Sequence, residues 1–256
     1  MNIFIKSIMV LSAALLVSGC SEVATFDYDN VPEPPMARFE EPVAKTVAVV
    51  PFLDERDARY HDPLLAKLAA AHPTEESGSL YLGFIPLLPG GYVEREKPEK
   101  NEDYVSLGGF DFNLQKDLAN AAFKSLKASN LFSSVTKASS MEDAEDADYI
   151  WRGKVLNTCY SGNVYSYCVT YLVSPVLWVL GAPYGSSKNE LYVRFELIER
   201  ATGKVVWKED YQGSDYVVQW IYGRLGKDTS LYPKLMRAAM NHSLGLLSYR
   251  LPVLLR

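Results

Sequence analysis

The sequence predicts an α/β (α+β) fold, a mixed and mainly antiparallel sheet flanked by helices, in the order β-α-β-β-β-β-α after an N-terminal export signal. Three observations predict this fold. Residues 46–52 are Val-rich and apolar on both faces, as in a strand that is covered on two sides. Residues 114–126 repeat apolar side chains every four positions, which is the spacing of an amphipathic helix. Residues 191–211 alternate apolar and polar side chains around a turn, as in a half-buried hairpin.

The first 20 residues have the layout of a secretory signal. Lys6 is their only charge, an apolar run extends from Ile8 to Val17, and small residues precede Cys20. The apolar run is too short for a retained spanning helix, which needs about 20 residues. The segment Val-Ser-Gly-Cys at 17–20 resembles the lipobox of bacterial lipoproteins. Cleavage would then remove residues 1–19 and leave Cys20 as the acylated N-terminus; the alternative is an ordinary secretory signal with an incidental cysteine.

This resemblance implies a membrane anchor and a location. Several fatty acyl chains on one residue, palmitate among them, hold a protein firmly on a bilayer. The lipid bilayer is therefore the first expected partner, through acylated Cys20. In the lipoproteins that the segment resembles, an Asp after the cysteine favours the inner membrane. Because Ser21 stands there, we expect an outer-membrane lipoprotein that faces the periplasm.

The mature chain is long enough for one large domain. Removal of residues 1–19 leaves 237 of the 256 residues and moves the net charge from −5 to −6. Residues 20–45 contain the acylated cysteine and a Pro-rich, acidic segment that we expect to be a disordered tether. Residues 46–256 would form a single α/β domain with an insertion at about 60–108. The excess of acidic residues and the lack of clustered Lys and Arg give no expected binding surface for nucleic acid.

The first half of the domain contains a strand, an insertion and a helix. Pro51 should end the strand at 46–52, since proline cannot donate to a ladder. A short helix should begin at Asp62, and residues 74–108 are rich in Gly and Pro. The helix from Leu114 to Leu126 should be capped by Asp111 or Asn113 and end near Asn130.

The second half contains the remaining strands and a helix. Short strands are expected at 131–135 and 149–156. In the hairpin, Leu191, Val193, Phe195 and Leu197 should face inward, joined by Val205, Trp207 and Tyr211 on the partner strand. A C-terminal helix should begin after Ser230 and stop at Pro252.

Two cysteines remain in the mature body, Cys159 and Cys168. In an oxidising compartment they are candidates for a disulfide. A four-residue turn at 162–165 would place them opposite each other on a hairpin. The alternatives are two buried free thiols, or a register that points the two side chains to opposite faces.

Four segments together resemble the periplasm-facing lipoproteins of the CsgG and LpoB type, with a related arrangement in the N-terminal domain of TolB. The segments are VAVVPFLDERD at 47–57, LKASNLFSSV at 126–135, ADYIWRGKV at 147–155 and ERATGKVVW at 199–207. The resemblance covers about half of the mature chain. It implies an α/β fold with a mixed sheet and a role in envelope assembly, secretion or peptidoglycan-synthase regulation, by contact and oligomerisation.

The sequence offers no catalytic constellation. The three histidines stand apart, no metal-ligand spacing is present, and no Gly-x-Ser-x-Gly segment occurs. We therefore expect no enzyme activity, no catalytic residues, no metal and no cofactor.

No charged residue interrupts residues 155–187, and residues 77–93 form a second charge-free patch. Pro175 and several hydroxyl groups make a simple spanning helix improbable. We expect a hairpin at 153–172, followed by an apolar turn or short helix at 175–183. Three interpretations stay open for this stretch: internal packing on residues 82–88, contact with a protein partner or a second copy, and membrane entry.

Surplus apolar area on exposed loops marks a contact site. The expected partner surface contains eight residues: Leu82, Phe84, Leu87, Leu172, Val176, Leu177, Trp178 and Leu180. The leading hypothesis is a membrane-anchored, non-catalytic protein-interaction or envelope-assembly module that binds an envelope protein or itself. The alternative is an oligomeric outer-membrane secretion or transport component of the CsgG type.

Overall fold

The structure is a computed structural model of the chain. It describes residues 24–31, 34–56, 90–95, 110–111, 113–165, 174–222 and 231–254. The export signal, Cys20, the helix expected at Asp62 and most of the expected insertion lie outside the described residues. The mixed α/β fold that the sequence predicts is confirmed.

The helices and strands follow the predicted order, with several short additions. In chain order they are β1 (Ala24–Thr25), β2 (Val43–Val49), β3 (Leu53–Asp54), β4 (Gly90–Arg95), β5 (Phe110–Asp111), α3 (Leu114–Ser129), β6 (Phe132–Lys137), β7 (Tyr149–Asn157), β8 (Cys159–Val164), α4 (Ser174–Val179), β9 (Gly185–Glu199), β10 (Val205–Gln219) and α5 (Tyr232–Leu254).

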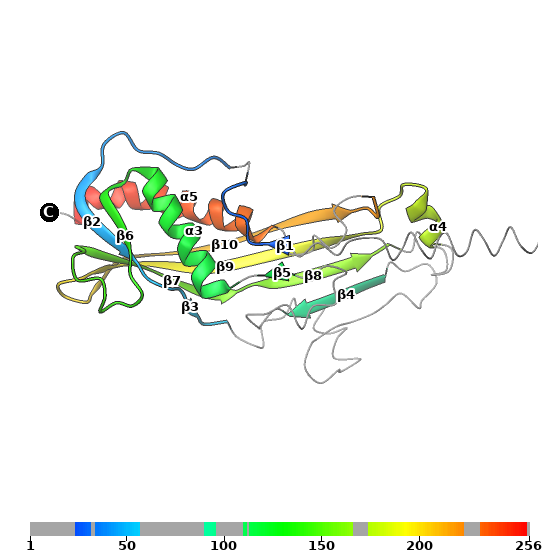
Figure 1. Ribbon diagram of the computed structural model, residues 1–256, viewed down its shortest axis with the longest axis horizontal. Coiled ribbons are helices and arrows are strands. Elements are labelled where there is room, and N and C mark those ends of the chain that lie inside the picture. The colour runs from blue at the N-terminus through cyan, green and yellow to red at the C-terminus, as the bar shows by residue number, and fades with distance from the viewer. Residues whose placement is uncertain are drawn as a thin grey trace, which may run out of the picture.

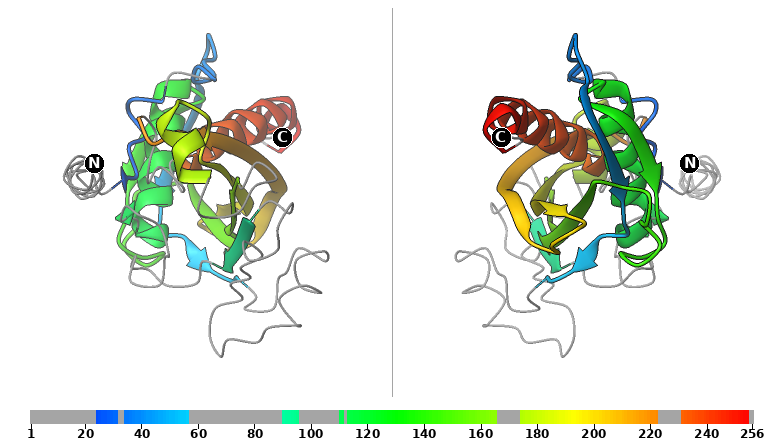
Figure 2. Two further views of the ribbon diagram at one scale, coloured as in Figure 1. Left: turned by 90° about the vertical axis from the view of Figure 1, so that its right-hand side faces the viewer. Right: turned by 90° about the vertical axis from the view of Figure 1, so that its left-hand side faces the viewer.

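The main sheet combines parallel and antiparallel pairs. Strand β2 lies between β6 and β7 and is parallel to both, whereas β9 is antiparallel to β7, β8 and β10. Helices α3 and α5 pack together over one face of this sheet (Figures 1 and 2). Helix α3 is bounded as predicted: the Asn113 side chain accepts a hydrogen bond from the Lys116 amide, and Asn130 ends the helix at φ 56°.

The hydrophobic core lies between the two helices and the sheet. The inward residues of β9 and the four-residue repeat of α3 are buried, as predicted. Trp151 is fully buried, and its ring centroid lies 5.4 Å from that of Phe195 and 5.7 Å from that of Trp207. Each large side chain buried in this way contributes about 1.5–3 kcal/mol. A smaller cluster that includes Ala48, Ile150 and Ile198 covers part of the opposite face.

A long arm extends from this body. Strands β7 and β8 follow each other along one side of β9, with a register shift between Val155 and Asn157, while β10 pairs with the other side. At 15 residues each, β9 and β10 span about 50 Å. Their distal halves, together with β8 and β4, continue past the helices and lead to α4 (Figure 1).

The structure corrects the hairpin expected at 153–172. Residues 159–164 form β8, whose residue Gly162 pairs with both Ser187 of β9 and Tyr92 of β4, so no turn lies at 162–165. The sheet partners of this segment, β4 and β9, come from distant parts of the chain. The residues at 162–165 therefore predicted a turn that does not form. Cys168 lies outside the described residues, so its disulfide with Cys159 stays a prediction and no longer has the hairpin as support.

Two smaller predictions are also wrong. Val205 is 45% exposed instead of inward-facing, because a register shift between Val205 and Trp207 interrupts the alternation. Pro252 does not stop α5, which continues to Leu254. The proline removes only the hydrogen bond to the carbonyl four residues earlier, and just two residues of the helix follow it.

Candidate functional site: the tip of the arm

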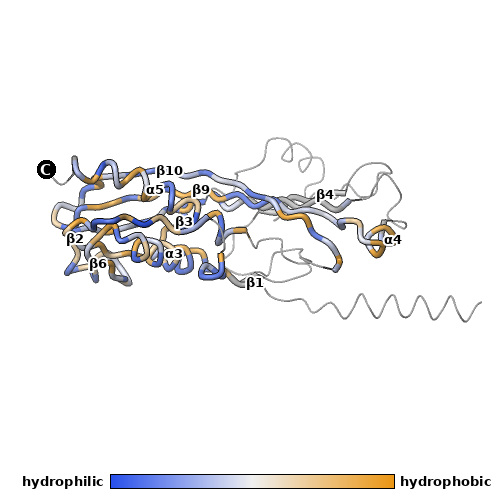
Figure 3. The backbone as a smooth tube through the Cα atoms, turned by 90° about the horizontal axis from the view of Figure 1, so that it is seen from above, coloured by the Kyte–Doolittle hydropathy of each residue, from blue (hydrophilic) through white to orange (hydrophobic). Residues whose placement is uncertain are grey.

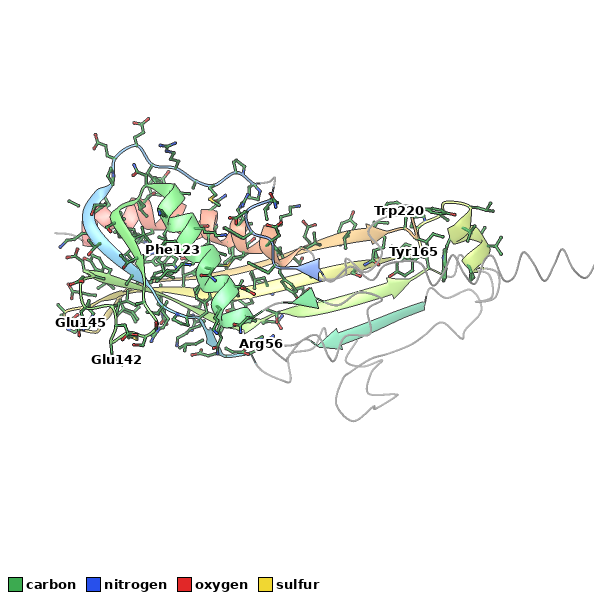
Figure 4. The ribbon with its side chains drawn as sticks, in the orientation of Figure 1. Arg56, Phe123, Glu142, Glu145, Tyr165 and Trp220 are labelled. Atoms are coloured by element: carbon green, nitrogen blue, oxygen red, sulfur yellow. The ribbon has the colours of Figure 1, made fainter. Side chains whose placement is uncertain are left out.

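The candidate site is the end of the arm, which we call the tip: residues 174–184 and 218–222, together with Tyr165. Helix α4 and the end of β10 meet there, and Figure 4 places Tyr165 and Trp220 beside α4. The chain folds back at this point by ordinary hydrogen bonds. The Tyr165 amide donates to the carbonyl of Tyr184 at 2.8 Å, and the Tyr184 amide donates to the carbonyl of Gln219 at 2.9 Å.

Helix α4 is closed by its own backbone. The amides of Leu180, Gly181 and Ala182 donate, each at 3.0 Å, to the carbonyls of Val176, Trp178 and Leu177. Gly181 has φ +100°, a conformation that glycine adopts without strain. A six-residue helix is therefore able to end in a tight turn and lead straight into β9.

Aromatic side chains attach α4 to the strands. The Trp178 indole Nε1 donates to the Tyr165 carbonyl at 3.1 Å, and its ring meets that of Tyr184 edge to face at 6.1 Å between centroids. The Tyr222 hydroxyl donates to the carbonyl of Val179. The polar ends of these two aromatic side chains are therefore satisfied within the tip.

The remaining surface of the tip is apolar and exposed. Leu180 is 78% exposed, Tyr222 70%, and Val176 and Val179 are each 55% exposed. In Figure 3, α4 is mostly orange, the colour of hydrophobic residues. No charged residue occurs in 174–187 or 216–222. Contiguous exposed apolar surface of this kind marks a contact site.

Four residues of the expected partner surface lie at the tip. Val176 and Leu180 are exposed, whereas Leu177 and Trp178 are half-buried. Leu172, Leu82, Phe84 and Leu87 lie outside the described residues. The packing of the stretch on residues 82–88 therefore stays a prediction.

Sequence reasoning missed the contribution of β10. Trp220, Ile221 and Tyr222 follow this strand and reach the tip from a segment 40 residues after α4. The signal was present, because YVVQWIY at 216–222 is a third charge-free stretch. Only the long pairing of β10 with β9 shows that this stretch meets α4.

Polar side chains separate the tip from the hydrophobic core. Ser187, Asn189 and Gln219 are buried, and the Gln219 Nε2 donates to the Ser187 hydroxyl at 2.9 Å. Closer to the body, Arg56 binds the carboxylate of Asp54 through two nitrogens at 2.7 and 2.8 Å and donates to the Thr158 hydroxyl at 2.7 Å (Figure 4). These contacts fix the base of the arm to the body.

The charged clusters of the described sheet are internally paired. Arg194 binds Asp210 at 2.6 and 2.7 Å, and this hydrogen bonding lowers the pKa of the Asp210 carboxyl. Lys154 lies 3.0 Å from Glu55 and 3.7 Å from Glu196. Across the described residues, no group of three or more His, Cys, Asp or Glu side chains is placed to hold a metal ion.

A small hollow of about 190 Å³ lies between the start of α3 and the ends of β2 and β6. Lys137 lines this hollow, and its Nζ donates to the Asn120 side chain at 2.7 Å and lies 4.7 Å from the centroid of the Phe123 ring (Figure 4 labels Phe123). Its charge is therefore already engaged within the fold.

The N-terminal segment expected to be a tether contacts the body. Tyr28 is only 3% exposed, and its hydroxyl lies 2.5 Å from the Ser125 hydroxyl of α3. Arg237 of α5 donates to the carbonyls of Tyr28 and Val31, and its guanidinium lies 4.9 Å from the centroid of the Tyr28 ring. Residues 24–31 therefore form a strap across α3 and α5, and only residues 21–23 stand between Cys20 and β1.

Among the described residues, no helix is both long and apolar enough to cross a membrane. No family model matches the chain. No curated protein matches it either.

Several solved structures are similar to this chain at low identity. A Xanthomonas campestris protein described by the family model DUF330 is 11% identical, with coverage of 88% of this chain and 91% of that one and a TM-score of 0.40. A Helicobacter pylori protein described as a putative neuraminyllactose-binding hemagglutinin homolog is 13% identical, with coverage of 90% and 91% and a TM-score of 0.41.

A third similar structure is a PelC variant from Paraburkholderia phytofirmans, described as a dodecamer. It is 16% identical, with coverage of 81% of this chain and 93% of that one and a TM-score of 0.34. At these identities and TM-scores the likeness carries no inference about the function or assembly of this chain. None of the three is named as a CsgG- or LpoB-type protein, so that resemblance stays a prediction.

Proposed function

We propose that this chain is a non-catalytic lipoprotein of the cell envelope. Acylated Cys20 anchors it in the outer membrane, and its body faces the periplasm. There it acts in envelope assembly, by contact with another envelope protein or with a second copy of itself. The observation that supports this proposal is the exposed, uncharged tip, which the arm holds away from the body (Figure 1).

The tip supports a contact role for a physical reason. Apolar area in contact with water is unfavourable unless another surface covers it, and three side chains of the tip are exposed in this way: Val176, Val179 and Leu180. A protein that used the arm only for its own stability would place these side chains inward. The structure instead uses hydrogen bonds of α4 and two aromatic anchors to hold them outward.

In-cell crosslinking tests this proposal with a matched pair of variants. Leu180→Asp places a charge on the tip, whereas Val205→Asp places the same charge on an exposed apolar position at the other end of β10. With an amine-reactive crosslinker, we expect a discrete crosslinked species for the wild type and for Val205→Asp. Its yield should fall several-fold for Leu180→Asp, because the charge makes contact with an apolar surface unfavourable.

Both variants change exposed positions, so both should fold, which the thermal midpoint of each purified protein verifies. Equal yields of the crosslinked species from Leu180→Asp and Val205→Asp would contradict a role for the tip. The complete absence of a crosslinked species from wild-type cells would contradict the interaction module itself.

A further inference from the structure

We infer that the tip lies in the interfacial layer of the bilayer, so that the molecule contacts the membrane at a second site besides Cys20. The inference rests on the proposed function for the lipid anchor, and it assigns the tip to lipid. The protein contact of the proposed function then depends on the tip for the orientation of the body on the membrane, which is why Leu180→Asp weakens both contacts.

The hydrogen bonding of the tip suits a lipid environment. Hydrocarbon offers no partners to backbone amides and carbonyls, so a segment that enters it has to satisfy these groups internally. The turn at 180–182 bonds back to α4, and the Trp178 and Tyr222 side chains donate to carbonyls of the same tip. A protein interface typically adds hydrogen bonds at its rim, so a tip that already uses these donors favours lipid over a protein surface.

The residue types point to the same environment. Tryptophan and tyrosine gather at the membrane–water boundary, because their rings prefer the apolar side and their polar ends the wet side. The tip carries Trp178, Tyr184, Trp220 and Tyr222, and the aliphatic side chains of α4 are exposed beside them. It carries no charge that would oppose entry.

The arm sets a limit to the depth. Residues 186–190 of β9 are polar on both faces: Ser187 and Asn189 are buried on one side, and Lys188 pairs with Glu190 on the other. On β10, Asp215 binds Lys234 at 2.6 Å. The polar arm begins directly behind the apolar tip. Only the tip suits entry, which agrees with the shallow depth of about 5–10 Å of interfacial segments.

The chain before the strap is short, and this limits how far the lipid on Cys20 can lie from the base of the arm. Residues 20–23 span at most about 14 Å when fully extended. They end at β1, which lies on the side of α3 that faces the tip (Figure 1). Because Tyr28 and Arg237 fix the following residues to the body, the lipid on Cys20 has to reach the bilayer from the base of the arm. The arm therefore leans toward the membrane that holds the anchor.

Tryptophan quenching by lipid tests this inference with the native residues. Trp178 and Trp220 lie at the tip, whereas Trp151 and Trp207 lie in the core and serve as an internal reference. The full-length mature, acylated protein is incorporated in vesicles of phosphatidylethanolamine and phosphatidylglycerol, with or without bromine on the acyl chains. We expect brominated vesicles to quench part of the emission, and we expect the Trp178→Phe/Trp220→Phe variant to lose this quenching.

A second pair of variants keeps the test independent of the aromatic packing. Leu180→Asp should reduce the quenching, whereas Val205→Asp should leave it unchanged, and both should still sediment with the vesicles through the lipid on Cys20. Vesicle-bound wild type with equal emission in both kinds of vesicle would overturn the inference and leave the tip to a protein partner. Failure of the wild type to sediment would instead overturn the lipid anchor, on which the proposed function also rests.

Discussion

At the scale of single residues, close packing in the core limits which side chains a position accepts. A Cβ on Gly153 of β7 would lie 2.2 Å from the ring of Phe52, which is buried and meets Phe195 edge to face at 6.1 Å between centroids. Because Phe52 is buried, its ring could give way only by displacing the side chains packed around it. Gly153 therefore permits a close approach of strand and ring.

Gly153→Ala should lower the free energy of unfolding by about 1–3 kcal/mol, the usual cost of overpacking. Gly245→Ala is the matched control, since nothing lies within 4 Å of a Cβ there and the residue is inside α5. It should raise the free energy of unfolding by about 0.5–1 kcal/mol, from helix propensity alone. Denaturant titration measures both, and equal stability of the two variants would refute the packing described for Phe52.

Asp148 makes stability depend on pH. The backbone amide of Thr46 donates to its carboxylate at 2.8 Å and Lys45 lies 3.2 Å away, and these contacts lower the pKa of Asp148 in the folded state. A carboxyl with a depressed pKa stabilises the fold above its unfolded-state pKa of about 4, and this contribution is lost as the pH falls through the folded-state pKa.

Asp148→Asn should therefore be less stable than the wild type at neutral pH, and the two should converge below about pH 4. Thermal unfolding as a function of pH measures the difference. A gap that stays constant from neutral to acidic pH would show that the contacts of Asp148 do not depend on its charge.

At the scale of elements, the strap connects the N-terminus to both helices. Tyr28 packs against Ser125 of α3 and under Arg237 of α5, whose guanidinium holds two carbonyls of the strap. Without this guanidinium the carbonyls of Tyr28 and Val31 lose their donor, which weakens the attachment of the strap to α5.

Arg237→Gln should release residues 24–31 from the helices, because it removes the guanidinium that binds the Tyr28 and Val31 carbonyls. Hydrogen exchange of the strap should accelerate at least tenfold, and exchange of α3 should change little. Lys234→Gln is the control on the same helix, since Lys234 pairs with Asp215 away from the strap. An unchanged exchange rate of the strap in Arg237→Gln would contradict its role.

Local patterns predicted the elements that depend on local patterns. The repeat of Leu114, Leu118 and Leu126 gave α3 with its cap, and the alternation around residues 191–197 gave the inward face of β9. The arm could not be predicted, because β8 pairs with residues far away in the sequence and has no alternation or turn of its own to reveal this. The strap was also missed, since its one buried tyrosine, Tyr28, lies among acidic residues just before the Pro-rich part of the segment expected to be a tether.

At the scale of the whole molecule, the body, the arm and the strap give the protein two ends with different chemistry. The core and helices lie at one end, and the uncharged tip lies at the other (Figures 1 and 3). Of the candidate site, the sequence located the α4 half through its missing charges. The β10 half became visible only through the long pairing of β9 with β10.

The mass of the detergent-solubilised protein separates the proposed module from the alternative of an oligomeric secretion component. We expect a monomer or dimer by light scattering, because detergent covers the apolar tip in place of its natural contact. The Leu180→Asp variant should have the mass of a monomer. A large, stable ring from the wild type would contradict the proposal and favour the alternative.

Labelling of cells with an alkyne-tagged fatty acid tests the central proposal most directly. The mature N-terminal peptide should begin at Cys20 and carry the tag, and Cys20→Ser should remove the tag and release the protein from the membrane fraction. If the N-terminal peptide of the wild type carries no tag, the anchor is absent and the account of a membrane-tied contact module is wrong.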